Sequence, residues 1–165
     1  MPGSYKGYRF CCNHMRASLS KPNHLTLGQL GEAYAAAYLE QCGYRLVAAN
    51  FTLPVGRNRR DAVINAELDL IAYDGGTLCF IEVKTRASDW FATPDVNVDR
   101  RKRRQIARAA RAYRQMFALE DEPYRYDVVT VVIGKDKTSP QVELLKSFWR
   151  EEQLAKQRWT ERFYE

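Results

Sequence analysis

Two apolar segments joined by a tight turn constrain the fold of this chain more than any other feature. Residues Glu67–Tyr73 and Leu78–Lys84 alternate in the manner of strands, and Asp74-Gly75-Gly76 between them is typical of a hairpin turn. The sequence therefore predicts an antiparallel hairpin. Both strands are apolar enough to be central in a sheet, so the charged residues within them need an explanation.

Acidic residues and a lysine gather on one predicted face of this hairpin, because side chains alternate along a strand. On the first strand, one face is expected to carry Glu67, Asp69 and Ile71, and the other Leu68, Leu70 and Ala72. On the second strand, one face is expected to carry Phe80, Glu82 and Lys84, and the other Cys79, Ile81 and Val83. Charges rarely occupy such positions unless they are paired or bind a metal. Two interpretations are open: an ion pair of Lys84 with Asp69 or Glu82 at the end of the sheet, or a metal site.

The metal interpretation has a definite chemistry. A carboxylate followed about a dozen residues later, on the paired strand, by Glu-x-Lys is the arrangement that metal-dependent phosphodiester cleavage needs. Asp69 and Glu82 would hold Mg²⁺, which prefers oxygen ligands, or Mn²⁺ in its place, and the Val83 carbonyl is a further candidate ligand. Lys84 would orient the attacking water or stabilise the developing negative charge.

The rest of the chain predicts a mixed central β-sheet flanked by helices, an α/β protein. The expected elements are a helix over Leu27–Gln41, a strand over Tyr44–Phe51, a long loop over Thr52–Asn65, a helix over Val98–Leu119, and strands over Tyr126–Ile133 and Val142–Leu145. The division of the chain that we expect is a flexible basic leader (1–24), one domain (25–146) and a charged C-terminal tail (147–165).

A basic helix carries the excess charge of the protein. Between Asp99 and Ala118 the chain has eight Lys or Arg residues and one acid, whereas the net charge of the whole chain is +6. Helical spacing separates a polar row (Arg100, Arg103, Arg104, Arg108, Arg111 and Arg114) from an apolar set (Ile106, Ala109, Ala110, Tyr113 and Phe117). Lys102 falls with the apolar set, directed toward the carboxylates or toward a phosphate. The row predicts either phosphate contacts, with Arg100, Lys102, Arg104, Arg108 and Arg111 as candidates, or a solvated helix face.

Glu32 is the one acid on a helix face of small and apolar residues, formed by Gly28, Ala35, Ala36 and Leu39. Such a face permits close approach to the sheet, so Glu32 is a further candidate for the site. The alternative is an acid that simply stabilises the first turn of its helix through the helix dipole.

Several motifs taken together resemble the YraN family of small bacterial proteins. They are Gly28-x-x-Gly31-Glu32, Gly43-Tyr44, Asn50, Glu67-Leu68-Asp69-Leu70-Ile71-Ala72, Phe80-Ile81-Glu82-Val83-Lys84-Thr85-Arg86, Val98-Asp99, Lys102, Arg108-Ala109-Ala110, Tyr113 and Tyr126-Asp127-Val128-Val129. The resemblance covers roughly residues 26–146. It implies membership of the PD-(D/E)XK nuclease superfamily, with a restriction endonuclease-like core.

The resemblance also implies roles for individual residues. The metal-binding aspartate of the superfamily falls on Asp69, its glutamate on Glu82, its lysine on Lys84, and the helix-borne acid of resolvase-like members on Glu32. The chain departs from the family pattern in two places. Ala66 stands where a glycine is usual, and the predicted loop over 52–65 is longer than expected.

Three functional hypotheses follow. We expect a Mg²⁺-dependent endonuclease-like protein that hydrolyses phosphodiester bonds, with DNA, branched or otherwise structured, as the expected nucleic acid. The second hypothesis is a non-catalytic nucleic-acid-binding module on the same fold, and the third is a protein-interaction scaffold, which leaves the basic helix unexplained. The sequence has no apolar run that could span a membrane and no secretory signal, which favours a cytoplasmic protein. A homodimer is left open.

Overall fold

The computed structural model describes residues 25–87, 97–134 and 140–154. In chain order its elements are α1 (Leu27–Gln41), β1 (Arg45–Arg57), β2 (Val63–Asp74), β3 (Thr77–Ala87), α2 (Arg100–Met116), β4 (Tyr124–Ile133), β5 (Gln141–Trp149) and the short 3-10 helix η1 (Glu151–Leu154). The predicted leader, residues 1–24, lies outside this part of the chain. No helix among the described residues is long and apolar enough to cross a membrane.

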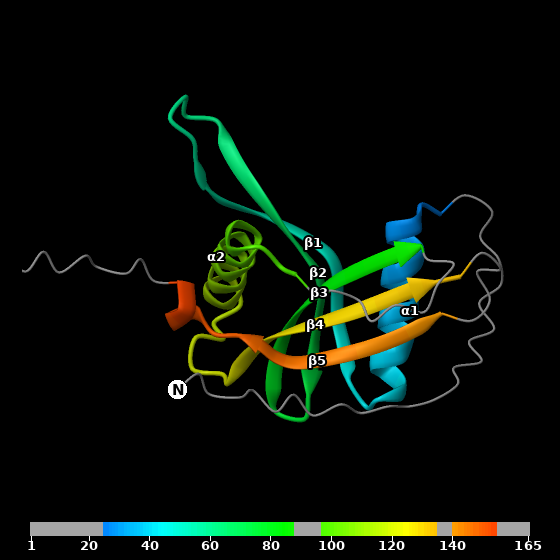
Figure 1. The fold of residues 1–165 in the computed structure, drawn as a ribbon. Helices are drawn as coiled ribbons and strands as arrows, with labels where there is room; N and C mark the ends of the chain where they lie inside the picture. Colours follow the sequence, from blue (N-terminus) through cyan, green and yellow to red (C-terminus); the bar gives the residue numbers. More distant parts are fainter. Residues whose placement is uncertain (1–24, 88–96, 135–139, 155–165) are drawn as a thin grey trace, which may run out of the picture.

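The strands form one sheet in the order β1-β2-β3-β4-β5. Neighbouring strands are antiparallel except β3 and β4, which are parallel. A parallel pair needs a crossover connection, and α2 lies in that connection. The helices α1 and α2 cover opposite faces of the sheet (Figure 1). This mixed sheet flanked by helices confirms the predicted α/β fold class and is compatible with a restriction endonuclease-like core.

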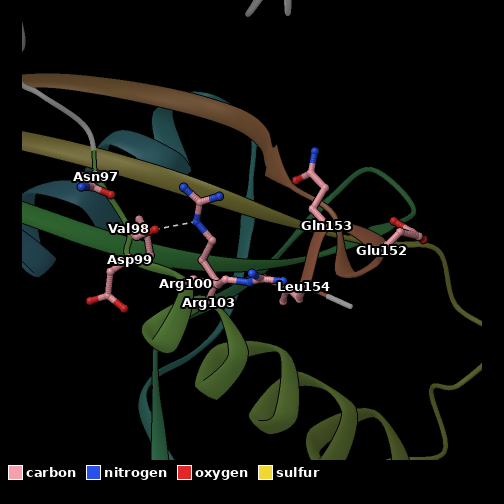
Figure 2. Close-up of a pocket in the computed structure, with 8 residues that line it drawn as sticks. All are labelled: Asn97, Val98, Asp99, Arg100, Arg103, Glu152, Gln153 and Leu154. Carbon is pink, nitrogen blue, oxygen red and sulfur yellow. Dashed lines mark hydrogen bonds between the residues drawn. The ribbon is translucent and has the colours of Figure 1, made fainter. Parts of the chain in front are cut away.

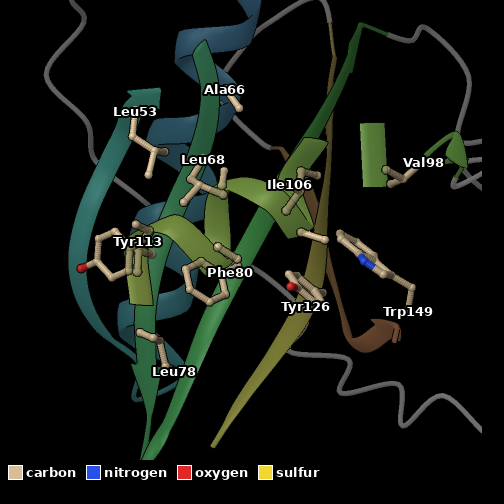
Figure 3. Close-up of a cluster of buried hydrophobic side chains, with 14 of the residues drawn as sticks. Leu53, Ala66, Leu68, Leu78, Phe80, Val98, Ile106, Tyr113, Tyr126 and Trp149 are labelled. Atoms are coloured by element: carbon tan, nitrogen blue, oxygen red, sulfur yellow. The ribbon is translucent and has the colours of Figure 1, made fainter. Parts of the chain in front are cut away.

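The hydrophobic core consists of two clusters, one on each face of the sheet. The cluster under α2 is rich in aromatic rings, which include Phe80, Tyr113, Tyr126 and Trp149 (Figure 3). The rings of Tyr126 and Trp149 stack with their centroids 4.9 Å apart. The cluster under α1 is largely aliphatic. Because both faces are covered, β4 is buried along most of its length and β3 is buried from Leu78 to Glu82.

The helix α1 is brought close to the sheet by a glycine. Its N-cap is Thr26, whose hydroxyl accepts a hydrogen bond from the backbone N–H of Gln29 at 3.3 Å. A Cβ atom at Gly31 would overlap the side chain of Thr85 on β3, so only glycine permits this packing distance. The buried face therefore passes through Gly31 and Leu39. The predicted face was wrong in including Gly28, which is exposed.

The long loop predicted over Thr52–Asn65 is not a loop. Most of these residues continue β1 and β2 as a hairpin, in which Leu53 pairs with Ala66 and Pro54 with Asn65. The prediction failed because Pro54 and Gly56 disfavour central strands. At the sheet edge a strand tolerates proline, and the register shift between Pro54 and Gly56 accommodates the glycine, whose φ is 148°.

The last strand is also longer than the sequence predicted. It runs past Leu145 to Trp149, whose ring is buried in the cluster under α2. The packed core therefore continues beyond residue 146, the predicted end of the domain, and η1 follows it. The helix α2 is shorter than the predicted Val98–Leu119 span, because Asp99 is its N-cap and accepts a hydrogen bond from the backbone N–H of Lys102 at 2.9 Å.

Candidate functional site

The acidic hairpin forms as predicted and then opens at Asp69. Strands β2 and β3 pair antiparallel from Asp74 and Thr77 at the turn as far as Leu70 and Ile81. At the next position, Asp69 Oδ2 accepts a hydrogen bond from the backbone N–H of Val83 at 2.8 Å. The carboxylate of Asp69 thus takes the place of a backbone partner between the two strands.

The alternation of β2 changes face at the same point. Leu68 and Ile71 both pack in the cluster under α2, whereas Leu70 packs under α1. The prediction that Leu68 shares a face with Leu70 was therefore wrong. On β1, Asn50 lies opposite Asp69, and its positive φ of 51° marks an irregular, left-handed position in that strand. The face of β2 thus changes at Asp69, next to this irregular position of β1.

Four charged side chains meet beside this irregularity. Lys84 Nζ lies 2.9 Å from Glu82 Oε1, and Lys102 Nζ, from the first turns of α2, lies 3.2 Å from Glu82 Oε2 and 4.0 Å from Asp69 Oδ1. The side chain of Glu82 is only 3% exposed, but those of Lys84 and Lys102 are 37% and 33% exposed. The cluster is a half-open site with a buried carboxylate at its base. It contains three of the four predicted catalytic residues.

The electrostatics of the cluster reflect two carboxylates held close together. Burial first, and the neighbouring Glu82 carboxylate second, raise the pKa of Asp69 to about 7, against the lowering effect of the Val83 N–H and Lys102. Burial acts to lower the pKa of the Lys102 ammonium, but Glu82 and Asp69 outweigh it and raise that pKa. The two carboxylates therefore favour a positive charge between them, and in the structure the Lys102 ammonium supplies it.

The donor set fits a divalent cation of the magnesium type. Glu82 Oε2 is buried beside the Lys102 ammonium at 3.2 Å, and Asp69 has one oxygen beyond the one bonded to Val83. Mg²⁺ is commonly held by only one or two carboxylates together with water and substrate phosphate. Among the described residues, no group of three or more acids, histidines or cysteines could hold a metal. A cation at Asp69 and Glu82 would have to compete with Lys102.

The fourth predicted catalytic residue, Glu32, is not in this cluster. Its Oε2 accepts a hydrogen bond from the side-chain amide of Asn50 at 3.0 Å. Asn50 lies between Ala49 and Phe51, which pair with Leu70 and Leu68, so this hydrogen bond joins α1 to the strand that neighbours Asp69. Sequence reasoning missed this contact of Asn50. The available signal was an asparagine inside an apolar strand, since asparagine tolerates left-handed backbone conformations.

Three arginines of the α2 row have partners within the protein, and two others have no carboxylate partner among the described residues. Arg111 Nη2 lies 2.8 Å from Glu151 Oε2 of η1, and Arg103 donates to the Val98 carbonyl at 2.6 Å. Arg114 donates to the carbonyls of Leu119 and Glu120. Of the residues predicted to contact phosphate, Lys102 and Arg111 thus have carboxylate partners. In the described part of the chain, the guanidinium groups of Arg104 and Arg108 have no such partner.

A pocket of about 580 Å³ lies at the start of α2 and is separate from the charged cluster. Its lining residues are Asn97, Val98, Asp99, Arg100, Arg103, Glu152, Gln153 and Leu154 (Figure 2). The Arg103 side chain lines this pocket and donates a hydrogen bond to the Val98 carbonyl. None of the residues that line it belongs to the cluster of Asp69, Glu82, Lys84 and Lys102. Arg100 is the only predicted phosphate contact in the wall of this pocket.

A second charged network lies at the opposite end of the sheet. Arg125 donates to Asp74 at 2.6 Å, to Asp127 at 3.0 Å and to the Tyr44 hydroxyl at 2.7 Å. Asp127, which is fully buried, also accepts a hydrogen bond from the backbone N–H of Ser147 at 2.8 Å. Burial raises the pKa of Asp127 although Arg125 opposes it. This network ties β2, β4 and β5 to Tyr44, the residue before β1.

Comparison with known proteins identifies the family. Residues 31–131 match the uncharacterised protein family UPF0102. The chain belongs to this family. It is 42% identical over 127 residues to a UPF0102 protein of Koribacter versatilis, covering 77% of this chain and 81% of that protein. It is 39% identical over 119 residues to one of Moorella thermoacetica, covering 72% of this chain and 91% of that protein. UPF0102 and YraN are two names of one family, so the predicted resemblance is confirmed.

Proposed function

We propose that this protein is a cytoplasmic, Mg²⁺-dependent nuclease that hydrolyses phosphodiester bonds in DNA. The observation that carries the proposal is the pair of carboxylates at the opening between β2 and β3, with the buried Glu82 Oε2 beside Asp69 and 3.2 Å from Lys102 Nζ. Two partly exposed ammonium groups, both paired with Glu82, flank these carboxylates. A phosphodiester is an anion that approaches readily only where positive charge accompanies the acids.

The chain's own residues would divide the work of such a reaction. Asp69 and Glu82 would hold the cation, which supplies charge neutralisation on the phosphate and a more acidic bound water. The Val83 N–H fixes the orientation of the Asp69 carboxylate. Lys84, held by Glu82 and partly exposed, would stabilise negative charge that develops on the phosphate. Lys102 would move from the carboxylates toward a substrate phosphate when the cation binds.

Metal titration tests the proposal. Wild-type protein is expected to bind Mn²⁺, and Asp69→Asn to bind it more than about tenfold more weakly, since losing even an outer partner of a ligand commonly costs 10–100-fold. Isothermal titration calorimetry at pH 8 measures both affinities. Glu67→Gln is the matched control, because Glu67 is an exposed acid two residues away that is no proposed ligand. Absence of Mn²⁺ binding by the wild type would reject the site.

The unpaired arginines of α2 predict a salt effect on DNA binding. If Arg104 and Arg108 contact phosphates, Arg104→Gln/Arg108→Gln should flatten the slope of log affinity against log salt by about 1.4–1.8, because each phosphate contact releases counterions. Fluorescence anisotropy with labelled DNA at several salt concentrations measures the slope. The melting temperature should stay near that of the wild type, since neither guanidinium has a partner among the described residues. An unchanged slope would show that this face is only solvated.

A further inference from the structure

The β1–β2 hairpin continues beyond the body of the protein as an arm, residues 54–65. Leu53 and Ala66 form the last buried pair, 2% and 9% exposed. Beyond them every residue of the arm is exposed except Val55, which is half-buried. In Figure 1 the arm extends past α2, away from the sheet. The arm is therefore ordered structure that contributes little to the core.

The tip of the arm is held by its own hydrogen bonds. The side-chain oxygen of Asn58 accepts from the backbone N–H groups of Arg60 at 2.8 Å and Ala62 at 3.0 Å. Arg57 donates to the carbonyl and the carboxylate of Asp61, at 2.9 and 3.1 Å. Asp61 itself has a positive φ of 61°. These contacts fix the turn without help from the rest of the protein.

The same contacts leave positive charge at the tip. Arg57 and Asp61 neutralise each other, whereas the guanidinium groups of Arg59 and Arg60 make no hydrogen bond or ion pair with any described residue. Both arginines lie in the middle of the fixed turn. The arm thus presents two unpaired cations on a preorganised support, which lowers the entropic cost of binding an anion.

The position and length of the arm suit a nucleic-acid duplex. Leu53 and Ala66 at its base belong to the core cluster under α2, so the arm rises on the side of the sheet that carries the cluster of Asp69, Glu82, Lys84 and Lys102. Four residues, 54–57, precede the turn and span about 13 Å at 3.3 Å per residue. The major groove of B-DNA is about 8.5 Å deep and admits a two-stranded β-ribbon.

We propose that this arm lies along a groove of duplex DNA and that Arg59 and Arg60 at its tip bind phosphates at the edge of that groove. The proposal rests on the proposed function, since it places the duplex against the α2 face of the sheet. Duplex RNA fits less well, because its major groove is narrow and deep. Contacts to phosphate hold a duplex without selecting a sequence. The arm therefore contributes affinity and orientation, and the chemistry remains at Asp69 and Glu82.

The test compares duplex and single-stranded DNA in EDTA, so that neither metal binding nor cleavage enters the measurement. Arg59→Gln/Arg60→Gln is expected to weaken binding to a duplex about tenfold or more and to flatten its salt slope by about 1.8. Affinity for a single strand of the same length should change less, because a single strand offers no groove. A second variant replaces residues 55–64 by Asn-Gly, which keeps the buried pair Leu53 and Ala66, and should have the same effect.

Arg45→Gln/Lys146→Gln is the matched control. It removes two charges at the other end of the sheet, where Arg125 still pairs with Asp74. The control should bind the duplex almost as the wild type does. Duplex affinity that is the same in the wild type and both arm variants would overturn the arm proposal while leaving the metal site untouched. If the wild type does not bind Mn²⁺ but both arm variants still bind the duplex more weakly than the wild type, only the nuclease proposal is overturned.

A second copy of the chain is the competing occupant of the arm, because Val63 and Ile64 on it are 53% and 37% exposed. Light scattering of the wild type and of the variant that lacks residues 55–64 decides this point. A wild-type dimer that becomes monomeric on loss of the arm, with duplex affinity unchanged, would overturn the DNA proposal. A monomer in both cases supports it.

Discussion

Lys84→Gln is expected to lower the rate of DNA cleavage in Mg²⁺ by about 10²–10³-fold, the usual effect of removing one group that stabilises charge in a transition state. The reason is geometric: the Lys84 ammonium lies 2.9 Å from Glu82 Oε1, and its side chain remains 37% exposed, open to a substrate phosphate. A panel of branched, single-stranded and duplex DNA measures the rate, and anisotropy in EDTA should show nearly unchanged affinity.

Lys146→Gln is the control for this experiment, because it removes an ammonium that is also paired with a carboxylate but lies at the far end of the sheet. It should cut DNA as the wild type does. Equal rates for Lys84→Gln and the wild type would contradict the role of Lys84. Wild-type protein that binds the panel but never cuts it in Mg²⁺ or Mn²⁺ would favour the non-catalytic binding module.

Arg125→Met is expected to lower the free energy of unfolding by about 3–5 kcal/mol at pH 8, because it leaves a buried charge without its partner. The charge is Asp127, which is fully buried and whose remaining hydrogen bonds to described residues come from the Ser147 N–H and the more distant Tyr44 hydroxyl. Asp74 is affected less, since Lys146 still pairs with it at 2.8 Å. Urea unfolding followed by circular dichroism measures the difference from the wild type.

The pH dependence of this loss identifies its cause. Without Arg125 the pKa of folded Asp127 rises further above its unfolded value, so stability falls as pH increases through that range. The difference from the wild type should therefore shrink from pH 8 to pH 5. Arg125→Met/Asp127→Asn removes the charge and should recover much of the stability at pH 8. A loss independent of pH and of Asp127 would instead indicate a packing defect.

Local sequence patterns were sufficient for the elements whose structure depends on near neighbours. The turn at Asp74-Gly75-Gly76 and the alternation around it predicted the hairpin of β2 and β3, because turn geometry sets the register of the strands that it joins. Helical spacing likewise separated the buried face of α2 from its arginine row. It also directed Lys102 to the sheet side, where the structure brings it to Glu82.

The tertiary structure alone decided features that depend on partners distant in the chain. Pro54 argues against a strand until β2 is seen to pair with it at a sheet edge, where a missing N–H is tolerated. The change of face at Asp69 arises where Asn50 and Val83 meet it from two other strands. Periodicity in one strand carries no information about such a neighbour.

In the candidate site, too, some features follow from the sequence and others only from the tertiary structure. The sequence determined which residue types lie along each strand and helix, and so brought Asp69, Glu82 and Lys84 forward as candidates. Only the fold decided that Glu32 meets Asn50 instead of this cluster, and that Arg111 is paired with Glu151. The physical reason is that a charged side chain takes its partner from whatever the packing brings within a few ångströms, and sequence separation does not limit that choice.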